Sequence, residues 1–139
     1  MAQESVEVAR NRWGVVLNHE RRRTLELRWL ASTSEMSDDG FKETLELFAA
    51  EGERARPGYM VIDATEFRHE LGDGVLAWRD REIIPRYNGA GVKKFAFLWP
   101  ENTPGTVESG GTPKPEGSAT FPTGWFTSRE RAYQWLMED

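Results

Sequence analysis

The chain has 139 residues, a formal net charge of −5 and no cysteine. Its length suits one domain with a single core, which we take to be residues 1–139. The acidic balance argues against nonspecific nucleic-acid binding, which depends on Lys and Arg to neutralise phosphates. The lack of cysteine excludes a disulfide framework and suits a cytoplasmic location. No stretch approaches the roughly 18 apolar residues that a membrane-spanning helix needs.

The first third of the chain predicts two strands and a helix. Residues 1–11 are polar and predict a flexible leader or an extension at a sheet edge. Apolar residues then alternate at 13, 15 and 17 and at 25, 27 and 29, a pattern typical of two half-buried strands joined by a hairpin loop. Ser37 and two aspartates precede an apolar stripe at 41, 45, 48 and 49, which predicts an amphipathic helix running to about residue 53.

Residues 59–62, Tyr-Met-Val-Ile, form an uninterrupted apolar run between Gly58 and Asp63. Such a run predicts a central strand buried on both faces. It should lie parallel to the strand that precedes the first helix. The carboxyl ends of such strands are where open α/β sheets place their binding crevices. We therefore expect any functional site to lie at the loop that begins with Asp63.

The second half predicts a helix over residues 74–84, which Pro85 should end or kink, a turn at 88–91 and a buried strand at 92–99. Residues 100–118 are rich in proline and glycine and predict a mobile loop or lid. A short strand at 124–126 precedes a final helix, where Thr127 and Glu130 have the spacing of a capping box. The order of elements predicts an α/β fold, a small mixed β-sheet with an antiparallel first strand and helices packed on it.

The run YMVIDATEFRHELGDGVLAW, followed by AGVKKFAFL, resembles the core of a STAS domain, the fold of bacterial anti-sigma-factor antagonists. In length and in the terminal WFTSRERAYQWL, the chain is more similar to the uncharacterised bacterial STAS-like (SpoIIAA-like) proteins. These proteins are grouped by fold with CRAL-TRIO lipid carriers. The resemblance covers about residues 13–137. It implies a noncatalytic interaction or regulatory module.

One departure from the regulatory STAS pattern concerns phosphorylation. That family carries an Asp-Ser-Ser-Gly-like turn whose serine is phosphorylated to switch partner binding. The corresponding stretch here is Glu-Leu-Gly-Asp-Gly at residues 70–74, and no serine or threonine lies between Glu66 and Trp99. We therefore predict that this phosphorylation switch is absent. Asp73 would place a permanent negative charge near the helix start, where a helix cap is the commoner role.

The loop after the central strand carries the acidic and histidine side chains that suggest chemistry: Asp63, Glu66, His69, Glu70 and Asp73. Carboxylates and a histidine bind a divalent metal or transfer protons when they converge. The chain has no HExxH, GxSxG, P-loop or GxGxxG motif. We therefore expect no catalytic residues, no metal and no cofactor. A metal-assisted enzyme built on loop 63–73 stays as an alternative.

Tryptophans offer a second kind of candidate. Those that can line an apolar pocket beneath the loop after residue 99 are Trp78, Trp99, Trp125 and Trp135. Core packing is the commoner role of tryptophan, and helical spacing favours it for Trp135. Trp78 lies off the apolar face of its predicted helix, so with Arg86 it is a candidate for a ligand mouth or a dimer surface.

Three hypotheses follow for the candidate surface formed by Asp63, Glu66, His69, Asp73, Trp78, Arg86 and Trp99. The first is a noncatalytic STAS-like module that binds a protein partner or a second copy of itself. The second is a carrier or sensor of a small apolar or amphipathic ligand. The third is the metal-assisted enzyme. A pocket of a few hundred Å³ favours the second, and a flat exposed apolar patch near Trp78 favours the first.

Overall fold

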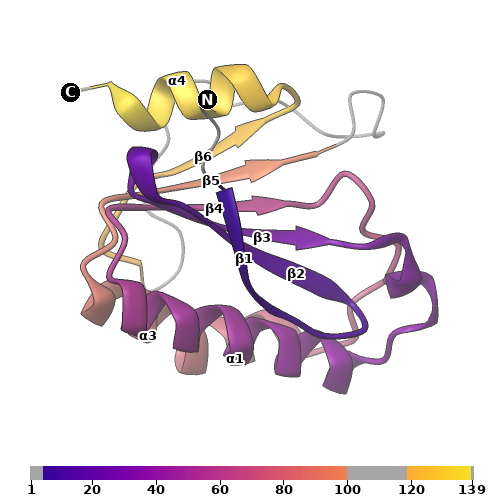
Figure 1. Cartoon of the computed structure of the whole chain (residues 1–139). Coiled ribbons are helices and arrows are strands. Elements are labelled where there is room, and N and C mark those ends of the chain that lie inside the picture. The colour runs from indigo at the N-terminus through magenta and orange to yellow at the C-terminus, as the bar shows by residue number, and fades with distance from the viewer. Residues whose placement is uncertain (1–4, 100–118, 139) are drawn as a thin grey trace.

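The computed structural model describes residues 5–99 and 119–138. Six strands form one mixed sheet in which spatial order follows sequence order, β1-β2-β3-β4-β5-β6 (Figure 1). The strands are β1 (Ser5–Arg10), β2 (Gly14–His19), β3 (Thr24–Trp29), β4 (Tyr59–Asp63), β5 (Lys94–Leu98) and β6 (Thr123–Phe126). The pairs β1–β2 and β2–β3 are antiparallel, and β3 to β6 run parallel. The predicted mixed α/β class is confirmed.

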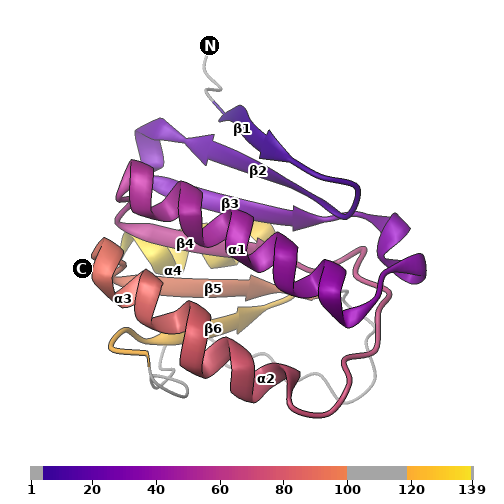
Figure 2. The same cartoon turned by 90° about the horizontal axis from the view of Figure 1, so that it is seen from below.

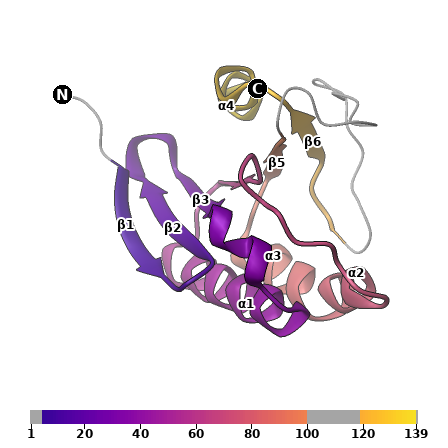
Figure 3. The ribbon, with the colours of Figure 1, turned by 90° about the vertical axis from the view of Figure 1, so that its right-hand side faces the viewer.

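Helices cover both faces of the sheet. Helix α1 (Asp38–Ala55) lies on one face beside a long helical stretch made of α2 (Val75–Trp78), a π-helical segment (Arg79–Ile83) and α3 (Ile84–Ala90). Helix α4 (Arg129–Met137) lies on the other face, against β5 and β6 (Figures 1 and 3). The larger core forms under α1 and α3, and a smaller one forms under α4.

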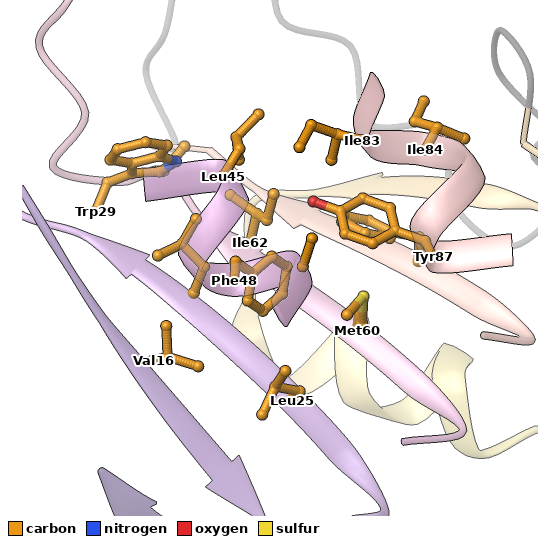
Figure 4. Close-up of a cluster of buried hydrophobic side chains, with 14 of the residues drawn as sticks. Val16, Leu25, Trp29, Leu45, Phe48, Met60, Ile62, Ile83, Ile84 and Tyr87 are labelled. Carbon is orange, nitrogen blue, oxygen red and sulfur yellow. The ribbon is translucent and has the colours of Figure 1, made fainter. Parts of the chain in front are cut away.

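The central position predicted for residues 59–62 is confirmed, because β4 lies between β3 and β5. Successive side chains of a strand point to opposite faces of the sheet. Met60 and Ile62 accordingly belong to the larger core, whereas Val61 belongs to the core under α4. Figure 4 shows Met60 and Ile62 gathered with Phe48 and Leu45 of α1. Strand β4 thus contributes side chains to both cores.

The first predicted helix is also confirmed. The hydroxyl of Ser37 accepts a hydrogen bond from the backbone N–H of Gly40 at 3.3 Å, as expected of an N-cap. The helix ends at Ala55, two residues beyond the expected end, where Arg56 adopts a left-handed conformation.

The amino-terminal segment forms structure. Residues 5–10 are the edge strand β1, so the sheet-edge interpretation is correct and a flexible leader over residues 1–11 is wrong for this part. Residues 1–4 lie outside the described residues, as do residues 100–118, for which a mobile loop was predicted.

The helix around Pro85 differs from its prediction. The chain stays helical from Val75 to Ala90, so Pro85 does not end it, and the expected turn at 88–91 is the last helical turn, closed by Gly91 at φ 87°. Pro85 directly follows the first residue of α3, and a π-helical segment precedes that residue. The backbone hydrogen bonds of a π-helical turn span one residue more than those of an α-helix. The N–H that proline lacks therefore costs less free energy at this point than within a regular α-helix.

Two predicted caps are wrong. Gly74, at φ 82°, is the N-cap of α2 without any side-chain hydrogen bond, so Asp73 does not cap that helix. For α4 the N-cap is Ser128, whose hydroxyl accepts from the backbone N–H of Arg131 at 3.3 Å, rather than Thr127. Ser and Thr are both good N-cap residues, so the sequence alone does not decide which of the adjacent Thr127 and Ser128 caps the helix.

No helix within the described residues is long and apolar enough to cross a membrane.

We predict that Val61→Asp unfolds the domain, because its carboxylate would be placed without a partner in the core under α4, where Val61 has no exposed surface. The expected loss is about 4 kcal/mol or more of unfolding free energy, measured by urea denaturation. Val6→Asp is the matched control, because Val6 is 59% exposed on β1 and the same change should cost little there. Equal losses for the two variants would show that β4 is not the buried centre of the sheet.

Candidate functional site

A cavity of about 460 Å³ lies between the sheet and the layer formed by α1, α2 and α3. Trp29, Ala64 and Trp99 line it, and these residues end or directly follow β3, β4 and β5. The cavity therefore reaches the carboxyl ends of the parallel strands. This is the edge where the sequence predicted a site, although most of the predicted residues do not line it.

Aromatic side chains dominate the lining. Those supplied by the sheet side are Trp29, Phe95, Phe97, Trp99 and Trp125, and those supplied by helices and connecting segments are Phe41, Phe67, Tyr87 and Phe121. Leu45, Ile62 and Ile84 add aliphatic surface. Figure 4 shows Trp29, Leu45, Ile62 and Tyr87 converging on this region from both layers. The wall is suited to burying an apolar molecule.

Strand alternation explains this wall. Phe95, Phe97 and Trp99 are spaced by two residues and share one face of the sheet. Phe97 is the register partner of Trp125 on β6, and their rings stack with centroids 4.3 Å apart and planes 10° apart. Trp99 stacks on Trp125 in turn, at 5.7 Å and 12°. The result is a row of nearly parallel rings.

Few polar groups line the cavity. Tyr87 is buried, and within the described residues its hydroxyl has no hydrogen-bond partner. Burial raises the pKa of Tyr87, and the charges of Arg79 and Arg86 offset this rise only in part, so the phenol stays neutral. Arg79 and Asp80 also line the cavity, where Arg79 Nη2 donates to Asp80 Oδ1 at 3.2 Å.

Asp63, the leading sequence candidate, faces away from the cavity. It follows Ile62, which lines the cavity, and therefore points to the opposite face of the sheet, toward α4. There Arg129 Nη2 donates to its Oδ2 at 2.6 Å, and the Thr65 hydroxyl donates to its Oδ1 at 2.6 Å. Asp63 is thus an ion-pair partner of α4.

The rest of the acidic loop does not converge. Glu66 is exposed and pairs with Arg68 at 3.2 Å, and Asp73 is exposed. His69 Nε2 lies 2.7 Å from Asp38 Oδ1, at the start of α1. Within residues 5–99 and 119–138, no group of three or more His, Asp and Glu side chains is placed to hold a metal ion. The metal-assisted hypothesis therefore has no assembled site there.

The remaining candidates separate as well. Trp78 is half-buried against the larger core, and Lys42 Nζ lies 5.4 Å from the centre of its ring. Arg86 donates to Glu53 on α1 at 2.7 and 3.0 Å. Trp99 alone among the seven predicted site residues lines the cavity. Trp135 of α4 is buried in the smaller core, as its helical spacing predicted.

Sequence reasoning missed a buried polar network on the face opposite the cavity. Glu26 of β3 has no exposed surface, and Arg129 donates to both of its carboxylate oxygens at 2.8 Å. His19 Nε2 lies 2.8 Å from Glu26 Oε1, and the Tyr133 hydroxyl donates to the same Glu26 oxygen at 3.1 Å. Arg28 Nη2 lies 3.1 Å away. Glu26 is therefore surrounded by hydrogen-bond donors.

The network holds Glu26 ionised. Burial alone would raise its pKa, but hydrogen bonds from His19 and Arg129 and the charges of Arg129 and Arg28 outweigh burial and hold the pKa far below its ordinary value. Conversely, the hydrogen bond with Glu26 raises the pKa of Arg129 despite the effect of burial. A carboxylate fixed in its charged form is a poor proton donor or acceptor near neutral pH. Its role is to dock α4 on the sheet.

Comparison of the chain with models of known protein families, with curated proteins and with solved structures found no match.

We predict that Arg129→Met costs about 3 kcal/mol of unfolding free energy, because it removes the bidentate partner of a fully buried carboxylate. The cost stays at the lower end of the usual range because His19 and Arg28 remain beside Glu26. Arg86→Met is the matched control, since the bidentate pair of Arg86 with Glu53 is solvent-accessible and should contribute less than about 1 kcal/mol. Chemical denaturation of both variants measures the difference, and similar losses would contradict a docking role for Arg129.

A second prediction concerns pH. The folded-state pKa of Glu26 lies below the ordinary value of 4.5, so its stabilising effect is present above about pH 4.5 and is lost as the pH falls from there toward the folded-state pKa. The free energy of unfolding should therefore fall between pH 5 and pH 3 more steeply for the parent than for Glu26→Gln. Urea titrations across this range provide the test. Parallel pH profiles would show that Glu26 is not the group responsible.

Proposed function

We propose that this chain is a noncatalytic binding protein, a carrier or sensor that holds a small apolar ligand in the cavity between the sheet and helices α1 to α3. The observation that carries the proposal is the cavity itself, about 460 Å³ and lined mainly by aromatic side chains. Small-molecule sites fall in the range of about 300–1,000 Å³ and are mostly apolar with a few polar groups. Protein interiors otherwise leave few voids larger than a water molecule.

Two observations favour this proposal over the other hypotheses. Among the described residues, the exposed large apolar side chains are Val6, Val8, Leu76 and Met137, which belong to three different elements. They provide no broad apolar patch around Trp78 of the kind that a partner surface needs. Among the carboxylates of loop 63–73, Asp63 pairs with Arg129 of α4 and the others are exposed, which gives a metal-assisted reaction little support.

The proposal includes a STAS-like relationship. Its support is the order of elements and the residues that resemble that family. The STAS-like proteins are grouped by fold with CRAL-TRIO lipid carriers, and that grouping agrees with a carrier role. Residues 70–74 contain no hydroxyl side chain, so the proposed module works without the serine phosphorylation of the regulatory STAS domains. Binding of a ligand would take the place of that covalent switch.

Binding of N-phenyl-1-naphthylamine, a neutral dye that fluoresces in apolar surroundings, tests the proposal. Ala119 lines the cavity, so Ala119→Trp should fill part of it and weaken dye binding about tenfold or more. Ala77→Trp is the matched control, because Ala77 is exposed on α2 and does not line the cavity.

The parent and Ala77→Trp should bind one dye molecule with similar affinity. Circular dichroism and thermal melting establish that Ala119→Trp is folded. Equal dye affinity in the two tryptophan variants, or no saturable binding to the parent, would contradict a ligand site in this cavity.

A further inference from the structure

The unpartnered hydroxyl of Tyr87 indicates which chemical class of ligand the cavity holds. We infer that the ligand is an uncharged ring compound with one hydrogen-bond acceptor, such as a carbonyl oxygen, that accepts a hydrogen bond from the Tyr87 hydroxyl. This inference rests on the proposed function, because it requires the cavity to be a binding site. It adds a selectivity that apolar burial alone would not produce.

The Tyr87 hydroxyl is buried in the layer that lines the cavity. Tyr87 is 2% exposed, and its oxygen has no hydrogen-bond partner within the described residues. Figure 4 shows this oxygen directed toward Ile62 and Leu45, both of which line the cavity. Buried polar groups in native proteins are nearly always hydrogen-bonded, so an orphaned donor requires an explanation. A ligand acceptor in the cavity supplies one.

Arg79 and Asp80 are the charged side chains within the described lining, and Arg79 Nη2 donates to Asp80 Oδ1. Arg79 Nε, like the Tyr87 hydroxyl, is buried and meets no hydrogen-bond acceptor among the described residues. A ligand carboxylate or amine would lose its hydration without gaining a counter-ion that is not already engaged. Tyr87 remains a neutral donor. The cavity therefore favours a neutral ligand that accepts one hydrogen bond.

Stacked aromatic rings shape the lining of the cavity. Phe97, Trp125 and Trp99 form a row of stacked rings in the sheet wall. Trp29 of β3 also stacks on Phe41 of α1, with planes 6° apart. Aromatic rings favour offset stacking and edge contacts with other rings. A ring compound matches this lining better than a flexible alkyl chain does.

Three probes with the same ring system test the inference. Naphthalene has no acceptor, 2-acetylnaphthalene has one neutral acceptor, and 2-naphthoate carries a charge. The parent should bind 2-acetylnaphthalene about 5- to 10-fold more tightly than naphthalene, as expected for one neutral hydrogen bond to a buried donor. It should bind 2-naphthoate more weakly than either. In Tyr87→Phe the ratio of acetylnaphthalene to naphthalene affinity should fall to about one.

Thermal melting of the ligand-free protein adds an independent readout. Tyr87→Phe should melt at the same temperature as the parent or higher, because the hydroxyl lacks a partner in the fold. A clearly lower melting temperature would show that the hydroxyl is bonded within the protein, and would overturn the inference.

The outcomes separate the inference from the proposed function. If no probe binds the parent better than it binds Ala119→Trp, the ligand site itself is wrong. If naphthalene binds but the acetyl group adds nothing, or if its advantage persists in Tyr87→Phe, the site stands and the role of Tyr87 is wrong. Preference for 2-naphthoate would likewise overturn the neutral class while leaving the site intact.

Discussion

Strand β4 has two faces with different chemistry, and this alternation determines where both the cavity and the polar network lie. Ile62 points to one side and lines the cavity, whereas Asp63 points to the other and pairs with Arg129 of α4. The strand is central and both faces are covered, so neither side chain can turn to solvent. The apolar site and the charged site are therefore adjacent in sequence but separated by the sheet.

The two sites are nevertheless mechanically connected through β6. Trp125 of that strand lines the cavity, and Arg129 begins the helix that directly follows it. Glu26 and Asp63 fix Arg129 from the opposite face. The buried ion pairs thus hold in place the edge strand whose aromatic side chain forms part of the cavity wall. Such pairs add little net stability over apolar packing, but breaking one is costly, so they favour one specific arrangement.

The fold could be predicted largely from local patterns, but the site could not. The continuous apolar run of β4 and the stripe of α1 are strong local signals, and both elements are present. The same alternation rule could have grouped Phe95, Phe97 and Trp99 on one face and assigned Asp63 to the other. Glu26 lies between Leu25 and Leu27 and has the pattern of a solvent-facing residue, because its burial depends on where α4 docks. That long-range contact leaves no local signature.

The most direct test of the ligand cavity uses the six tryptophan indole N–H signals in a ¹⁵N NMR titration with 2-acetylnaphthalene. Trp29, Trp99 and Trp125 line the cavity, whereas Trp13, Trp78 and Trp135 do not. If the ligand binds in this cavity, the first three signals should shift together and saturate at one equivalent while the others stay in place. Shifts confined to Trp78 or Trp135, or no saturable shift of any signal, would contradict it.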